Sequence, residues 1–272
     1  VVHYISQAFP INSANAEIDG YRDGPQGVRA NQNILRMKRK NGEPVRIGWT
    51  VSYTTLNPTV ATTIDDTEML ALIYDRLLWI GPDGSPEMML GRSINVIDDT
   101  TIDVPIRSGH SFSDGKPVTA EDVKFSFDFL KSSEAVAFKR ALEGIASVEV
   151  VAPDTVRFKL RNPYAPFIMN TLGQVYILPK HVWEKLVEEK GIKRPQDFPN
   201  AAPVASGPYT VRYHREGQEL YLARRADHFA RPQSDIIHIA FGSAEVLAQA
   251  LRTGAIEVSF QPLVPAAVSE FS

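Results

Sequence analysis

Two hydrophobic periods alternate along this 272-residue chain, and the alternation limits the possible folds more than any single motif does. In some segments apolar residues recur at every second position, as in Ile102, Val104 and Ile106, which is typical of half-buried strands. In others, such as 120–130, they recur at steps of three and four, which predicts helices. Strands and helices interleaved in this order indicate an α/β or α+β fold.

Strand signals are strongest where β-branched and aromatic residues end at a turn. The segment VRIGWTVSY, which begins at Val45, predicts a buried strand before the turn at Asn57-Pro58. The other expected strand features are hairpins around 152–155 and 214–217, a sheet-edge position for the strand that carries Pro105, and a last strand at 255–260.

Helix starts are marked by residues that can cap the first turn. Thr119, followed three residues later by Asp122, predicts the clearest start. Thr67 is predicted to cap a second helix. That helix carries Leu70, Ile73 and Leu77 on its apolar face. Further helices are expected at 135–145, at 179–190, and from the cap Ser243 to Gly254 with Val246, Leu247 and Leu251 facing inward.

Composition excludes several classes of protein. Lys and Arg number 29 against 32 Asp and Glu, a net charge of −3, and no basic run occurs, so nucleic acid is not expected as a partner. The longest apolar stretch, 69–80, is interrupted by Asp75 and Arg76 and is too short to cross a bilayer. Absence of cysteine excludes disulfides, zinc ribbons and thiol catalysis.

Residues that could carry chemistry give little support for an enzyme. None of the six histidines stands three to five positions from another, so no metal or other cofactor is predicted. Ser111, His110 and Asp114 could be assembled into a hydrolytic triad, but they lie within five residues and no G-x-S-x-G elbow occurs. We therefore predict no catalytic residues, and a small amide or ester hydrolase remains an alternative.

Six motifs in a fixed order resemble the extracellular solute-binding proteins of family 5, the peptide- and nickel-binding subunits of ABC importers. They are TLNP from Thr55, IYDRLLWIGPDGSPEMMLGRS from Ile73, SGHSFSDGKPVTAEDVKFSFDFL from Ser108, SGPYTV from Ser206, RRADHF from Arg224 and AQALRTGAIEV from Ala248. Three positions depart from the family pattern. Asn57 and Glu257 stand where Asp is usual, and Ile94 stands where Trp is usual.

The resemblance implies a type II periplasmic-binding-protein-like α/β fold, with a mixed sheet flanked by helices, as lobe I of a two-lobed clamshell. On that basis we expect a loop-rich segment at 1–45, lobe I at 46–260 and the start of the crossover to lobe II at 261–272. Most of lobe II would be missing. Because relatives place the carboxylate that pairs with a peptide's amino terminus in lobe II, the resemblance implies that this chain alone binds peptide weakly or not at all.

The resemblance also implies a function outside the cytoplasm. The protein would capture oligopeptides or related solutes in the periplasm or at the cell exterior, with lipid anchoring left open, and deliver them to ABC permease subunits in the membrane. We expect ligand contacts first at Tyr53, Thr54, Thr55, Leu56 and Asn57, because an extended strand at a lobe edge can offer its backbone to a peptide. A sensor or chaperone-like module without transport is the remaining alternative.

Phe138 is a further, weaker candidate for ligand contact, since its helical spacing is also that of a core residue. By the same reasoning, Tyr74, Asp75, Thr119 and Asp122 are expected to have structural roles.

Overall fold

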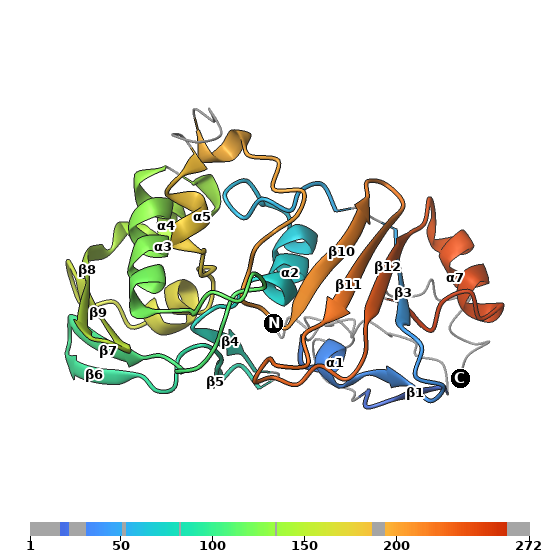
Figure 1. The fold of residues 1–272 in the computed structure, drawn as a ribbon, viewed down its shortest axis with the longest axis horizontal. Coiled ribbons are helices and arrows are strands. Elements are labelled where there is room, and N and C mark those ends of the chain that lie inside the picture. The colour runs from blue at the N-terminus through green and yellow to red at the C-terminus, as the bar shows by residue number, and fades with distance from the viewer. Residues whose placement is uncertain are drawn as a thin grey trace, which may run out of the picture.

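The computed structural model describes residues 17–21, 31–50, 53–81, 83–133, 135–186 and 194–259. A five-stranded sheet occupies one half of the molecule (Figure 1), in the order β10 (Tyr209–Arg215), β11 (Glu219–Arg224), β12 (Ile236–Ala240), β3 (Val45–Trp49) and β13 (Val258–Ser259). Strands β10, β11 and β12 are antiparallel, whereas β3 runs parallel to both of its neighbours. The sheet is therefore mixed, as predicted.

Two helices flank this sheet. Helix α2 (Ile64–Ile73) contacts β10, and helix α7 (Ala244–Arg252) contacts β3 and β13 on the other side in Figure 1. The α7 contact has its own small apolar cluster, in which Leu247 and Leu251 pack with Ile256. The five-stranded sheet thus has helices on both sides, as expected for an α/β fold.

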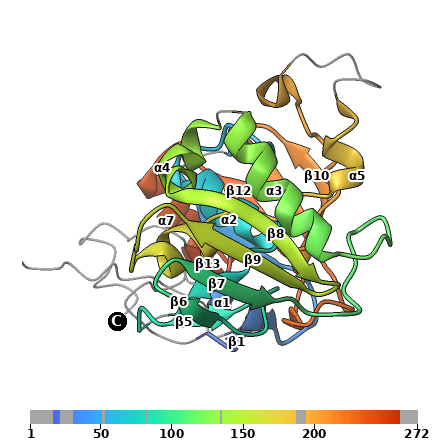
Figure 2. The same ribbon diagram turned by 90° about the vertical axis from the view of Figure 1, so that its left-hand side faces the viewer.

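A four-stranded antiparallel sheet forms the second half of the molecule. Its order is β6 (Asn95–Asp98), β7 (Thr101–Pro105), β9 (Thr155–Leu160) and β8 (Ile145–Ala152). Helices α3 (Ala120–Ser132) and α4 (Lys139–Glu143) lie beside this sheet (Figure 2). The hairpin predicted around 152–155 is confirmed as β8–β9, and the hairpin around 214–217 as β10–β11.

The remaining elements are short. They are the pair β1 (Ile18–Asp19) and β2 (Lys38–Arg39), helix α1 (Asn31–Arg36), the hairpin β4 (Leu78–Ile80) and β5 (Pro86–Met88), a 3₁₀ turn at Val136–Phe138, a π-helical turn at Ile168–Leu172, α5 (Lys180–Trp183) and a 3₁₀ turn at Pro195–Asp197. A single cluster of buried apolar side chains runs through both halves, from Trp49 to Phe158 and Trp183. The two sheets therefore share one core.

Helix α2 starts one turn earlier than predicted. Its N-cap is Thr63, whose hydroxyl accepts a hydrogen bond from the Asp66 amide at 3.0 Å. Thr67 lies inside the helix, and Leu77 lies beyond its end, so the prediction of a cap at Thr67 is wrong. Two adjacent acids, Asp65 and Asp66, occupy the first turn and favour the earlier start through the helix dipole.

Two further predictions, the edge position of the strand with Pro105 and the inward orientation of Val246, are also wrong. Strand β7 has a neighbour on each side, so it is not an edge strand. Pro105 is tolerated because β6 pairs with β7 only as far as Asp103, and the last pairing of β7 is with β9. On α7, capped by Ser243 as predicted, Val246 is 55% exposed and does not face inward.

The expectation of a loop-rich start is corrected for residues 31–39, where α1 and β2 form and where Ile34 and Met37 are fully buried. The predicted helix at 135–145 is a 3₁₀ turn followed by the short α4. Of the helix predicted at 179–190, only α5 is regular, and 187–190 lie outside the described residues. So do 1–16, 22–30 and the predicted crossover at 261–272.

None of the described helices is both long enough and apolar enough to cross a membrane.

Comparison of two threonines tests the start of α2. Thr63→Ala removes the acceptor of the Asp66 amide and should lower the free energy of unfolding by about 1 kcal/mol. Thr67→Ala, the matched control, removes a hydroxyl that bonds only within the helix and should change stability by a few tenths of a kcal/mol. Urea denaturation of both variants measures the difference. A larger loss in the Thr67 variant would contradict the assignment.

Candidate functional site

The predicted contact segment begins with a buried tyrosine. The Tyr53 hydroxyl lies 2.8 Å from Nδ1 of His238, and the Tyr53 ring meets Trp49 edge to face at 5.7 Å between centroids. Burial lowers the pKa of His238 to about 3, so its imidazole is neutral at physiological pH. These three side chains and the β10–β11 turn enclose a cavity of about 10 Å³, which has room for one water.

Thr54 and Asn57 are held by hydrogen bonds within the protein. The Thr54 amide and hydroxyl both donate to the carboxylate of Asp66, at 3.0 and 2.8 Å. The Asn57 side-chain amide donates to the carbonyls of Pro195 and Phe198, at 2.9 and 2.8 Å. Residues 53–57 lie outside the described strands, with a bend at Leu56.

Only two side chains of this segment reach solvent. Thr54 is exposed and Thr55 partly so, whereas Leu56 is buried, as is Asn57. Phe138 is also buried and packs edge to face on Tyr176 at 5.8 Å, which is the position of a core residue. Ligand contact by these residues remains a prediction, and Thr54 and Thr55 are the members whose position favours it.

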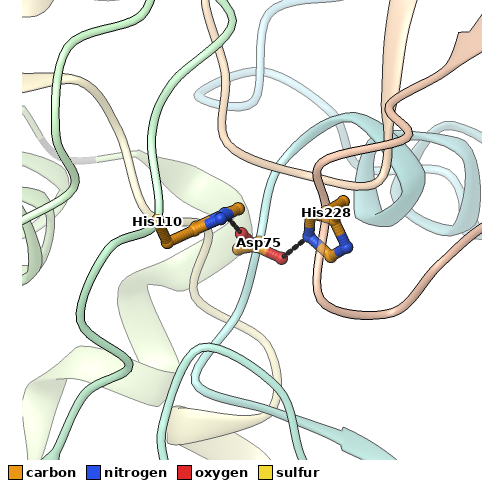
Figure 3. A group of neighbouring side chains, drawn as sticks. All are labelled: Asp75, His110 and His228. Carbon is orange, nitrogen blue, oxygen red and sulfur yellow. Dashed lines mark hydrogen bonds and ion pairs between the residues drawn. The ribbon is translucent and has the colours of Figure 1, made fainter.

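A second cluster joins residues that are distant in sequence. Asp75 follows α2, His110 lies in the loop after β7, and His228 lies in the loop after β11 (Figure 3). His110 Nε2 is 2.9 Å from one carboxylate oxygen of Asp75, and His228 Nε2 is 3.2 Å from the other. All three side chains are buried. The carboxylate is thus bracketed by two imidazoles.

Neighbouring groups determine which imidazole nitrogens carry hydrogen. Nδ1 of His228 accepts the backbone N–H of Ala230 at 3.0 Å, so its Nε2 must be the donor to Asp75. Nε2 of His110 lies 2.8 Å from the carbonyl of Ser206, which can only accept, so this nitrogen also carries hydrogen. Asp75 therefore receives two N–H groups.

The pKa of Asp75 reflects two opposed effects. Complete burial raises it, because a carboxylate loses its hydration, while His228 and His110, which both donate hydrogen bonds to the carboxylate, lower it. The second effect is larger, and the pKa lies below its ordinary value. The carboxylate is consequently ionised at neutral pH.

The same three residues have the composition of a metal site. Their ligating atoms lie within 4.8 Å of one another, and two histidines with one aspartate form a donor set that suits Zn²⁺. A metal ion at both Nε2 atoms would displace their hydrogens, and Nδ1 of His228 would then need a hydrogen that faces the N–H of Ala230. The hydrogen bonds present therefore favour a structural hydrogen-bonded cluster over metal ligation.

Residues 86–270 match the family model for the middle part of bacterial extracellular solute-binding proteins, family 5. The chain belongs to this family.

Curated relatives and solved structures agree with that assignment. The oligopeptide-binding protein AppA of Bacillus subtilis is 28% identical over 74% of this chain, and the peptidoglycan-binding protein YepA of Agrobacterium fabrum is 29% identical over 71%. The crystal structure of the substrate-binding protein CtaP from Listeria monocytogenes is 26% identical, covers 80% of this chain and has a TM-score of 0.70. The type II periplasmic-binding-protein-like fold is thereby confirmed.

The chain spans less than half the length of these relatives. It covers 37% of AppA, 32% of YepA and 44% of the CtaP chain. The crystal structure of AppA in complex with a nonapeptide, at a TM-score of 0.68, is likewise covered to 43%.

Membership of a solute-binding family fits the prediction that no catalytic residues are present. The alternative triad is not assembled, because Asp114 pairs with His181 at 2.7 Å and the hydroxyl of Ser111 lies 3.3 Å from Arg225. His110 is instead held by Asp75.

Sequence spacing missed the histidine cluster. His110 lies 35 positions from Asp75, and His228 lies 153 positions from it, so no local ligand spacing could reveal them. The usable signal was Asp75 itself. An acidic residue inside the apolar run 69–80 must be paired when that run is buried.

The departure at Asn57 has a structural reason. Its amide supplies two donors to two backbone carbonyls, and a carboxylate at this place would face both carbonyls with no hydrogen to give. Asn57→Asp should therefore lower the free energy of unfolding by about 2 kcal/mol at pH 7. The deficit should shrink below about pH 4, where the introduced carboxyl becomes a donor.

Asn170→Asp, at an exposed position on the π-helical turn, is the control for Asn57→Asp. It should leave stability nearly unchanged in the same urea titrations. Equal losses at both positions would show that the Asn57 amide has no special role.

Removal of the Asp75 charge tests the cluster. Asp75→Asn should lower the free energy of unfolding by about 3 kcal/mol at pH 7, because two buried N–H donors lose a charged acceptor. The folded pKa of Asp75 is lowered, so its contribution is present above the unfolded pKa of about 3.9 and is lost as pH falls through the folded value. The difference in free energy of unfolding between wild type and Asp75→Asn should therefore shrink as the pH falls through the folded pKa of Asp75.

Asp128→Asn on the exposed face of α3, where Asp128 pairs with Lys124, serves as the matched control and should have little effect. Guanidinium titrations at several pH values give both comparisons. A pH-independent deficit in the Asp75 variant would contradict the role of its charge.

Proposed function

We propose that this chain is part of the substrate-binding component of an ABC importer that captures oligopeptides or related solutes. The observation that carries the proposal is the family match over residues 86–270. The fold supports it, since the similar structures include AppA in complex with a nonapeptide. Proteins of this family are extracellular or periplasmic, so we place capture in the periplasm or at the cell exterior and delivery at permease subunits in the membrane.

We further propose that residues 46–260 form lobe I of a two-lobed receptor. Two observations support this division. The two sheets share one apolar core, and the chain covers only 43% of a peptide-bound relative. Ligand contacts with both lobes would then stabilise a closed form by hinge bending, and a single lobe would supply only part of the binding free energy.

The peptide contacts that we propose for lobe I are the exposed Thr54 and the partly exposed Thr55. Their support is indirect. The Thr54 backbone and hydroxyl are anchored on Asp66 at the first turn of α2, so the segment is held in one conformation before any ligand arrives. A preorganised contact loses less conformational entropy on binding than a loose loop does.

Calorimetry with a mixed oligopeptide library tests both proposals. A version of the protein with both lobes should bind peptide with micromolar affinity, whereas the 272-residue chain should bind at least about a hundredfold more weakly, a loss of about 2.7 kcal/mol. In the two-lobed protein, Thr54→Trp should block binding by its bulk.

Val151→Trp, at an exposed position on β8, is the control for bulk and should bind as the wild type does. Absence of peptide binding by the two-lobed protein would overturn the proposed ligand class. Equal affinity of the single chain would overturn the division into lobes, and an unaffected Thr54 variant would overturn the contact segment.

A further inference from the structure

A cavity of about 300 Å³ lies beside the histidine cluster, apart from the predicted peptide contacts. It is lined by Arg92, Arg107, Ser108, Gly109, His110, Asp227 and Phe229. None of these residues belongs to the segment 53–57. We propose that this cavity binds a small organic solute through a carboxylate group, and the inference does not rest on the proposed peptide-binding function.

Arg107 is the residue that points to an anion. Its backbone N–H donates to the carbonyl of Leu90 at 2.9 Å, its Nε donates to the carbonyl of Met89, and its guanidinium lies 4.6 Å from the centre of the Phe229 ring. These contacts hold the planar group in one place. Among the described residues, no carboxylate lies within ion-pair distance of Arg107, and its terminal nitrogens donate no hydrogen bond.

The other charges at the cavity are already paired. Arg92 lies 2.8 Å from Asp154, and Asp227 lies 2.9 Å from the buried Arg225. Arg107 therefore leaves one positive charge at the wall without a protein counter-charge. A guanidinium with two terminal nitrogens available matches a carboxylate in bidentate geometry.

Size and wall chemistry favour an organic solute over an inorganic ion. A cavity of about 300 Å³ is at the lower end of the range of small-molecule sites and is far larger than a single oxyanion needs. Phe229 supplies an apolar face, and it is rigid because its ring lies 4.1 Å from that of His228 and 5.1 Å from that of His110. A flat apolar body with one carboxylate fits this combination.

His110 lies in the wall of the cavity and also belongs to the buried cluster. Its Nε2 lies 2.9 Å from the Asp75 carboxylate and 2.8 Å from the Ser206 carbonyl, so these contacts fix the position of its ring.

Benzoate and its neutral analogue benzamide are suitable probes. Calorimetry or ligand-detected NMR with the chain at pH 6 should show saturable binding of benzoate and at least about tenfold weaker binding of benzamide. Arg107→Gln should weaken benzoate binding about tenfold, which corresponds to about 1.4 kcal/mol. Arg92→Gln, which removes a cation already paired with Asp154, should weaken it by less than about threefold.

Thermal unfolding of each variant shows that it is folded. Arg107→Lys keeps the positive charge but lacks the planar guanidinium, so it distinguishes the effect of the charge from that of bidentate hydrogen bonding. Equal binding of benzoate and benzamide, or an unchanged affinity after Arg107→Gln, would overturn the proposal.

Discussion

The buried carboxylate of Asp75 is the interaction on which the arrangement of the two sheets depends. It lies just after α2, and its two oxygens receive N–H groups from His110 and His228, which come from opposite halves of the molecule. The Asp75 carbonyl also accepts the amide of Ile177 at 2.9 Å. One residue thus ties together the loops that join the two sheets, and a charge without these partners could not be buried at this depth.

Local signals predicted most of the regular structure, because hairpins, caps and strand periods depend on residues close in sequence. The capping residues Thr119 and Asp122 marked the start of α3 correctly, since the Asp122 carboxylate accepts both the amide and the hydroxyl of Thr119. At α2 the signal was ambiguous, because Thr63 and Thr67 could each have capped the helix. The acids between them favour Thr63 as the N-cap, since they then lie in the first turn.

The contacts that the sequence could not predict are all long-range. The Asn57 amide bonds to carbonyls at Pro195 and Phe198, about 140 residues away, and the partners of Asp75 lie 35 and 153 positions from it. Side-chain chemistry limits such partners but does not select them, because any buried donor would satisfy the same carboxylate. Asn57 shows the converse. Its departure from the family pattern is explained once its two acceptors are known.

Helix α2 links the predicted contact segment to the histidine cluster. Asp66 in its first turn anchors Thr54, and Asp75, just past its end, holds His110 and His228. Residues Met69–Ile73 between them are fully buried, so the helix cannot shift without disturbing the core of both halves. The two regions are therefore parts of one rigid body. In the proposed two-lobed receptor, a hinge that closes over a ligand would therefore lie outside α2.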